Sequence, residues 1–99
     1  MVELYQEVEI MYDDTIALAV EKYGIEAQSR VAMEECAELI QAINKCLRYP
    51  TAQSRSRLIE EIADVRIMID QLCQIYDIDE TDVGGVQIEK IERLRKKLL

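Results

Sequence analysis

Residues 56–76 read SRLIEEIADVRIMIDQLCQIY, and their apolar side chains recur at helical spacing. One face of the expected helix carries Leu58, Ile62, Val65, Ile69, Leu72 and Tyr76. A second apolar group, formed by Ile59, Ala63 and Ile67, lies roughly on the opposite side. A helix that is apolar nearly all round is buried on more than one side. Four short helices of one chain can hardly bury it on both sides. We therefore expect this helix, and with it the helix over 26–48, to lie in a subunit interface.

The helical period continues over the rest of the chain, and no stretch alternates as a strand would. Gly24 is expected to end a first helix as a left-handed cap, and Pro50 to stop a second one. Asp79 is a candidate cap for the last helix, in which Gly84-Gly85 should weaken or kink the first turns. The expected helices span about 2–22, 26–48, 56–76 and 80–97. The fold class predicted is all-α, an antiparallel bundle of about four helices completed by homo-oligomerisation.

Length and charge narrow the class of protein further. Ninety-nine residues predict one domain over 1–99. Twenty acidic residues against twelve basic ones give a net charge of −8, which argues against a nucleic-acid partner. The same charge suits a protein that binds cations, or binds anions through cations. The chain has no histidine, which excludes His-based general base chemistry and the ligand sets of non-haem iron and catalytic zinc.

The location expected from the sequence is the cytoplasm. The start of the chain, MVEL, lacks the basic residues and apolar run of a signal peptide. No apolar run approaches the roughly 20 residues that a membrane span needs, so no membrane partner is expected. The three cysteines, an odd number, are expected to be reduced small core residues. They are Cys36, Cys46 and Cys73.

Two pairs of carboxylates are the main indication of function, because they could bind a metal ion. Glu35 and Glu38 stand three residues apart on one expected helix, and Glu61 and Asp64 on the next. Residues at this spacing share a helix face, and antiparallel packing of the two helices would let the pairs face each other. Four carboxylates without a His or Cys ligand suit Mg²⁺ or Mn²⁺ rather than Zn²⁺.

Acidic pairs at this spacing also occur elsewhere in the chain, so their surroundings matter more than their spacing. On a helical wheel Glu61 falls between Met68 and Leu72, beside the apolar seam, where a charge is costly unless it is paired or bound to metal. The alternative interpretation is that these acids are neutralised at the rim of the seam by basic residues. The candidates for that role are Arg30, Lys45, Arg57 and Arg66.

At these positions the sequence resembles the MazG-type all-α nucleoside triphosphate pyrophosphohydrolases. The family motif, Glu-Glu-x-x-Glu followed by Glu-x-x-Asp, corresponds here to Glu34-Glu35-x-x-Glu38 and Glu61-x-x-Asp64, with 22 residues between them. The resemblance covers roughly residues 28–99 and best fits the small single-domain members. It implies a helical bundle completed by dimerisation. It also implies hydrolysis of a nucleoside triphosphate to a monophosphate and pyrophosphate.

The resemblance further implies that magnesium is held by Glu35, Glu38, Glu61 and Asp64. Without histidine, a carboxylate must take the proton from the attacking water, and the residues adjacent to the ligands, Glu34 and Glu60, are both candidates. The outer phosphates need cations, and the candidates are Lys45, Arg48, Arg57, Lys90, Arg93 and Lys97. Lys45 shares a side of its helix with Glu38, and the candidates from the family's basic C-terminal stretch are Lys90 and Arg93.

The function expected is therefore a magnesium-dependent nucleotide pyrophosphohydrolase, with a homodimer or homotetramer as its assembly and Mn²⁺ as a substitute metal. A non-catalytic helical-bundle protein with a regulatory or interaction role, retaining the fold, is the alternative, because a fold does not guarantee turnover. A di-iron carboxylate bundle would need Glu-x-x-His pairs, which the absence of His excludes.

Overall fold

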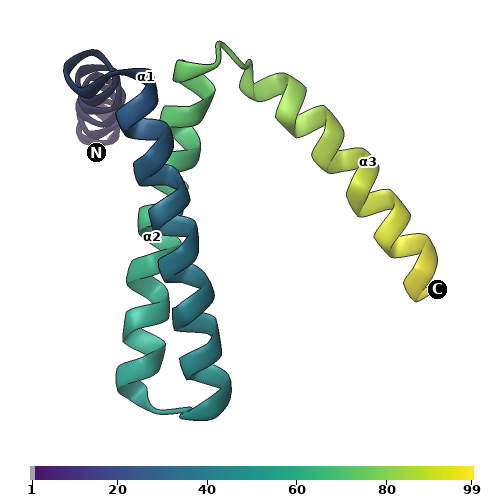
Figure 1. Ribbon diagram of the computed structural model, residues 1–99. Helices are drawn as coiled ribbons and strands as arrows, with labels where there is room; N and C mark the ends of the chain where they lie inside the picture. The colour runs from purple at the N-terminus through teal and green to yellow at the C-terminus, as the bar shows by residue number, and fades with distance from the viewer. Residues whose placement is uncertain (1) are drawn as a thin grey trace.

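The computed structural model describes residues 2–99 and contains three α-helices (Figure 1). They are α1 (Val2–Arg48), α2 (Ala52–Ile75) and α3 (Glu80–Leu98). No strand occurs within residues 2–99, which confirms the all-α class. None of the helices in this range is both long and apolar enough to cross a membrane.

The predicted break between a first and a second helix at Gly24 is confirmed, but helical structure resumes at once on its far side, so both segments form the one element α1 and three helices are counted instead of four. This residue has φ 88° and ψ 172°, so the helical conformation is broken although α1 continues on both sides. The positive φ expected there is confirmed, but ψ is extended rather than that of a left-handed helical cap. Backbone of this kind is essentially restricted to glycine. The chain changes direction at Gly24, which separates an N-terminal segment, residues 2–23, from the remainder of α1 (Figure 1).

Helix α2 begins at Ala52, four residues before the predicted start, because a capping box forms at Thr51. The Thr51 hydroxyl accepts a hydrogen bond from the Ser54 amide at 3.1 Å, and the Thr51 amide donates to the Ser54 hydroxyl at 3.0 Å. At the other end Asp77 adopts φ 50°, and the Ile78 amide donates to the Cys73 carbonyl. This is a Schellman motif with aspartate in place of the usual glycine. The predicted cap at Asp79 is confirmed by its bond from the Thr81 amide.

The C-terminal part of α1 and α2 pack side by side as an antiparallel helical hairpin (Figure 1). Gln28 Nε2 donates to Gln71 Oε1 at 2.6 Å in the buried seam between them. Tyr12, on the N-terminal segment, donates a hydrogen bond to Asp70 on α2. This bond, together with burial, raises the pKa of Tyr12 to about 12, because the neutral phenol is the form that donates. The phenol therefore fastens the N-terminal segment to α2 at every physiological pH.

Few apolar side chains are buried in the part of the chain whose burial is described. They are Ala32, Ala42 and Met68 of the hairpin and Ile16 of the N-terminal segment. Tyr76, which the pattern places on an apolar face of α2, is not a core residue of the described chain, since it is 56% exposed and its hydroxyl hydrogen-bonds to that of Ser29. The cysteines are likewise not core residues, since Cys36 is exposed and the others are half-buried. The seam between two helices is too narrow to enclose side chains from both faces of α2.

Helix α3 diverges from the hairpin and contains no buried residue (Figure 1). It runs without interruption through Gly84-Gly85, so the expected kink does not occur. Apolar side chains on it stay exposed, among them Val83, Val86 and Leu94. The chain exposes 8531 Å² in total, against about 5,800 Å² for a compact monomer of 11.5 kDa. Its radius of gyration is 16.5 Å, against about 12.6 Å for a compact chain of this length.

Candidate functional site

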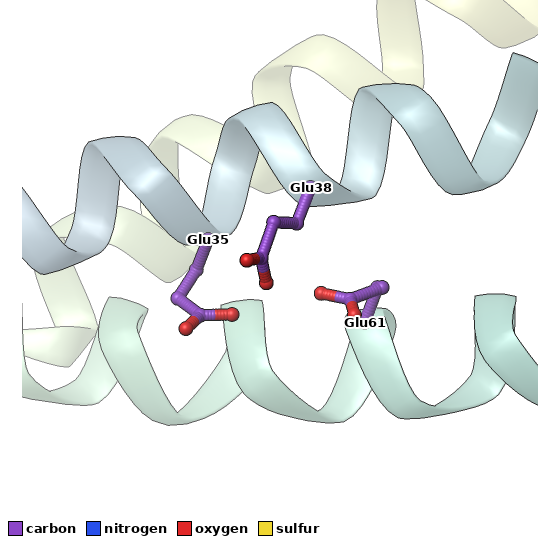
Figure 2. A group of neighbouring side chains, drawn as sticks. All are labelled: Glu35, Glu38 and Glu61. Atoms are coloured by element: carbon purple, nitrogen blue, oxygen red, sulfur yellow. The ribbon is translucent and has the colours of Figure 1, made fainter.

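The helical hairpin brings three predicted ligands together. Glu35 and Glu38 project from α1, and Glu61 projects from α2 into the space between the helices (Figure 2). Each offers a carboxylate oxygen, and the three oxygens lie within 4.8 Å of one another. Asp64 lies one turn further along α2, half-buried and outside this group of three. These four residues are called the acidic cluster below.

The two acids nearest the seam are unusual because they have buried oxygens without partners. Glu61 is 2% exposed and Glu35 is half-buried. The Oε2 atoms of both residues are buried and accept no hydrogen bond. Buried carboxylate oxygens without a partner are costly, so two of them in a helix seam form a donor set suited to a cation.

The alternative of neutralisation by basic residues holds for one carboxylate oxygen only. Arg57 Nε lies 2.9 Å from Glu61 Oε1, one helical turn away on α2. The Arg57 side chain is 55% exposed, so this bond neutralises Glu61 only partly. Of the other candidates, Arg30 pairs with Glu26, and Lys45 and Arg66 form no ion pair within residues 2–99.

Burial and mutual repulsion of the carboxylates determine the electrostatics of the acidic cluster. Burial raises the pKa of Glu35, and the charges of Glu38, Asp64 and Glu61 raise it further. Burial also raises the pKa of Glu61, opposed by the Arg57 guanidinium and reinforced by Glu38 and Asp64. The charge of Asp64 thus acts on both buried acids. Metal-free, the cluster stores repulsion that a cation would relieve.

A hard divalent cation fits this donor set. Mg²⁺ binds oxygen ligands at about 2.0–2.1 Å, so two ligands on opposite sides of the ion are roughly 4.2 Å apart. The separation of up to 4.8 Å among the oxygens of Glu35, Glu38 and Glu61 is close to that span. Small side-chain rotations would close the difference. The two unpartnered Oε2 atoms supply lone pairs that no protein group uses.

A cavity of about 790 Å³ adjoins the acidic cluster. It lies at the closed end of the hairpin, between the last turns of α1, the connecting turn and the first turns of α2, and it is called the hairpin cavity below. Glu38 and Glu60 stand in its wall beside two cations, Lys45 and Arg57, and Tyr49 lines it near the connecting turn. Its lining therefore combines acids that suit a metal with cations that suit an anion.

The remaining predicted site residues lie elsewhere. Glu34 is exposed on α1 and does not line the hairpin cavity. Lys90 and Arg93 lie on α3, which diverges from the hairpin, so within one chain they are not part of its wall (Figure 1). Tyr49 is one of five tyrosines that the sequence offers for stacking on a base, and it is the one that lines the hairpin cavity. Its position just before Pro50, where the second helix had to stop, did not distinguish it from the other four.

The family comparison agrees with this geometry. The model of the MazG nucleotide pyrophosphohydrolase domain matches residues 23–99, a stretch that contains the whole acidic cluster and the hairpin cavity. No curated protein and no solved structure gives a significant match. Because the family model covers more than three quarters of the sequence, the chain belongs to the MazG nucleotide pyrophosphohydrolase family.

Proposed function

We propose that this protein hydrolyses nucleoside triphosphates between the α- and β-phosphates, releasing a nucleoside monophosphate and pyrophosphate, in a single domain over residues 1–99. The observation that carries the proposal is the pair of buried, unpartnered Oε2 atoms on Glu35 of α1 and Glu61 of α2, both inside the family's matched region. A protein with a charge of −8 approaches a polyphosphate only where cations intervene. The alternative, a non-catalytic interaction protein, gives no reason to hold these oxygens unpartnered.

The acidic cluster would hold Mg²⁺, or Mn²⁺ in its place, through Glu35, Glu38, Glu61 and Asp64. When bound, such an ion lowers the pKa of the attacking water and offsets charge on the phosphate oxygens. The protein's own part is to keep the carboxylates converged between two rigid helices. Because Glu61 is 2% exposed, its carboxylate has little freedom to move away into solvent.

The proton of the attacking water needs a carboxylate acceptor outside the ligand set. Glu60 lines the hairpin cavity beside Glu38, whereas Glu34 does not. We therefore assign the general base to Glu60, whose carboxylate would accept the proton, and leave Glu34 as an exposed residue of α1.

The two candidate bases give a matched pair of variants. Glu60→Gln should lower kcat by about 10²–10⁴-fold, the usual contribution of a positioned general base, and should leave the Mg²⁺ affinity nearly unchanged. Glu34→Gln should retain near-full activity. Steady-state pyrophosphate release measures both, and a large loss in Glu34→Gln with full activity in Glu60→Gln would reverse the assignment.

The activity itself is tested with a panel of ribo- and deoxyribonucleoside triphosphates. The purified protein is incubated with each nucleotide and Mg²⁺, and the products are separated to distinguish pyrophosphate from orthophosphate. Monophosphate and pyrophosphate in equal amounts support the proposal. Release of orthophosphate alone would place cleavage at the β–γ bond, and no release from any nucleotide would favour the non-catalytic alternative.

The assembly proposed is a homodimer or homotetramer. One chain exposes about 2,700 Å² more than a compact monomer of its mass would, which is an area typical of obligate interfaces. Charge complementarity suggests how copies meet. The N-terminal segment, residues 2–23, carries six acidic residues and one basic residue, whereas residues 88–98 of α3 carry five basic and two acidic ones. Packing of α3 on a second copy would cover its apolar side chains.

Multi-angle light scattering at micromolar concentration checks the assembly. The expected mass is two or four times 11.5 kDa at physiological salt. Replacing the two exposed apolar residues Val86 and Leu94 of α3 by Asp should lower that mass, while the same change at the polar exposed residue Gln87 should not. A stable 11.5 kDa species of the wild-type protein with full activity would contradict the proposal.

A further inference from the structure

The hairpin cavity contains more positive charge than a metal site requires. Lys45 and Arg57 both line it, from α1 and α2 respectively. The first turn of α2, which begins at Ala52, also borders it, and the N-terminus of a helix carries partial positive charge. Lys45 forms no ion pair within residues 2–99, so its charge remains available to a ligand.

Arg57 occupies an intermediate position between the acidic cluster and the hairpin cavity. Its Nε atom lies 2.9 Å from Glu61 Oε1, its side chain is 55% exposed, and the residue lines the hairpin cavity. The terminal nitrogens of its guanidinium form no hydrogen bond or ion pair within residues 2–99. A planar guanidinium with free donors is well suited to bind two phosphate oxygens at once.

We propose that the hairpin cavity is the subsite for the β- and γ-phosphates, which become pyrophosphate when water attacks the β-phosphorus and the nucleoside monophosphate leaves, and that Arg57 exchanges Glu61 for these phosphates when substrate and metal bind. Lys45 supplies the second cation of this subsite. The inference rests on the proposed hydrolase function, which it deepens by assigning one end of the substrate to one part of the site.

Electrostatics give the reason for the exchange. With a divalent cation held by the acidic cluster, Glu61 would be neutralised and the guanidinium repelled, so the bond between Arg57 and Glu61 would lose most of its attraction. Since the Arg57 side chain is 55% exposed, it can rotate without disturbing the helix seam. The same event therefore opens the cluster to metal and releases a cation toward the phosphates.

The experiment is isothermal titration of inorganic pyrophosphate into the full-length protein in the presence of Mg²⁺. Arg57→Gln should weaken pyrophosphate binding by about 10- to 100-fold, the usual effect of losing a hydrogen-bonded ion pair. Arg57→Lys should recover part of this loss because it keeps the charge without the planar donors. Arg55→Gln is the matched control, since Arg55 is exposed on the same helix and does not line the cavity. Circular dichroism verifies that each variant is folded.

Two further titrations separate this role from others. Binding of a nucleoside monophosphate should be unchanged in Arg57→Gln, and Mg²⁺ binding without nucleotide should be unchanged or tighter, because a competitor for Glu61 is gone. Loss of monophosphate binding with intact pyrophosphate binding would place the nucleoside end in the cavity and overturn the inference. A parallel loss of Mg²⁺ affinity would make Arg57 a residue that merely positions Glu61, and would overturn it too.

These outcomes are distinct from failure of the proposed function. A wild-type protein that hydrolyses nucleotides while Arg57→Gln binds pyrophosphate normally refutes the subsite alone. A wild-type protein that releases no pyrophosphate from any nucleotide, yet binds pyrophosphate through Arg57, refutes the hydrolase and supports the subsite as a binding site.

Discussion

Glu61→Gln is expected to remove most nucleotide hydrolysis while leaving the metal-free protein at least as stable as wild type. The glutamine loses a charged ligand, and since loss of an outer-shell partner already costs a metal site 10–100-fold, the fall in turnover should exceed about 100-fold. Stability should not fall, because the amide removes a buried charge that has an unpartnered oxygen and three acidic neighbours. The lost ion pair with Arg57 contributes little, since that side chain is 55% exposed.

Pyrophosphate release and thermal unfolding in EDTA measure the two effects. Glu89→Gln is the control, because Glu89 is an exposed acid on α3 with the same spacing to a second acid, and it should alter neither quantity. Strong destabilisation of metal-free Glu61→Gln would contradict the expected result. It would show that the ion pair with Arg57 holds the hairpin together and that Glu61 is a structural residue.

Removal of divalent cations should reduce pyrophosphate release to background, with full recovery on adding excess Mg²⁺ or Mn²⁺. It should also lower the melting temperature. A ligand that binds only the folded state, at a concentration 100 times its dissociation constant, adds about 2.7 kcal/mol to the free energy of unfolding. For a domain of this size that raises the melting temperature by roughly 10–20 °C. The comparison requires melting curves with EDTA and with Mg²⁺ at one protein concentration. Undiminished turnover in EDTA would refute the role of the acidic cluster.

The stabilisation by Mg²⁺ should increase with pH, because two carboxyl groups of the acidic cluster have raised pKa values. The pKa values of Glu35 and Glu61 are raised in the folded protein above their ordinary value of 4.5. At these two sites the folded state binds protons more tightly than the unfolded state, so their contribution to metal-free stability is fully present below pH 4.5 and is lost as pH rises through the raised pKa values. Mg²⁺ must displace those protons. The gain in melting temperature should be small near pH 4.5 and large at pH 7–8.

The convergence of Glu35, Glu38 and Glu61 was predictable because it depends on helical period alone. Three-residue spacing puts two acids on one helix face, and the wheel placed Glu61 beside Met68, which is where both side chains are buried. The ends of the helices were predictable only where a strong local signal existed, as at Asp79. The start of α2 was missed because Thr51, Ser54 and Ser56 are all good caps, and only the reciprocal bonds between Thr51 and Ser54 select among them.

What covers an apolar face could not be predicted from the pattern. Periodicity shows that Ile59 and Ile67 lie on one apolar face of α2 and Tyr76 on the other. Their exposure depends on which element packs on each face, and within one chain all three side chains remain exposed. Nor could the sequence show that Arg57, rather than Arg30, Lys45 or Arg66, would pair with Glu61. Side-chain direction, rather than spacing, decides which cation meets which acid.

The wall of the hairpin cavity comes from one continuous stretch of chain, residues 38–60, that closes on itself through a short turn. Only Glu38 of the four proposed metal ligands falls inside this stretch. An insertion or deletion near Pro50 would therefore alter the depth and lining of the cavity while the ligands remain on the same helix faces. Changes in the length of this turn would therefore alter which phosphates the cavity prefers without changing the proposed metal ligands. In the laboratory, replacing residues 38–60 alone would exchange the whole wall of the cavity.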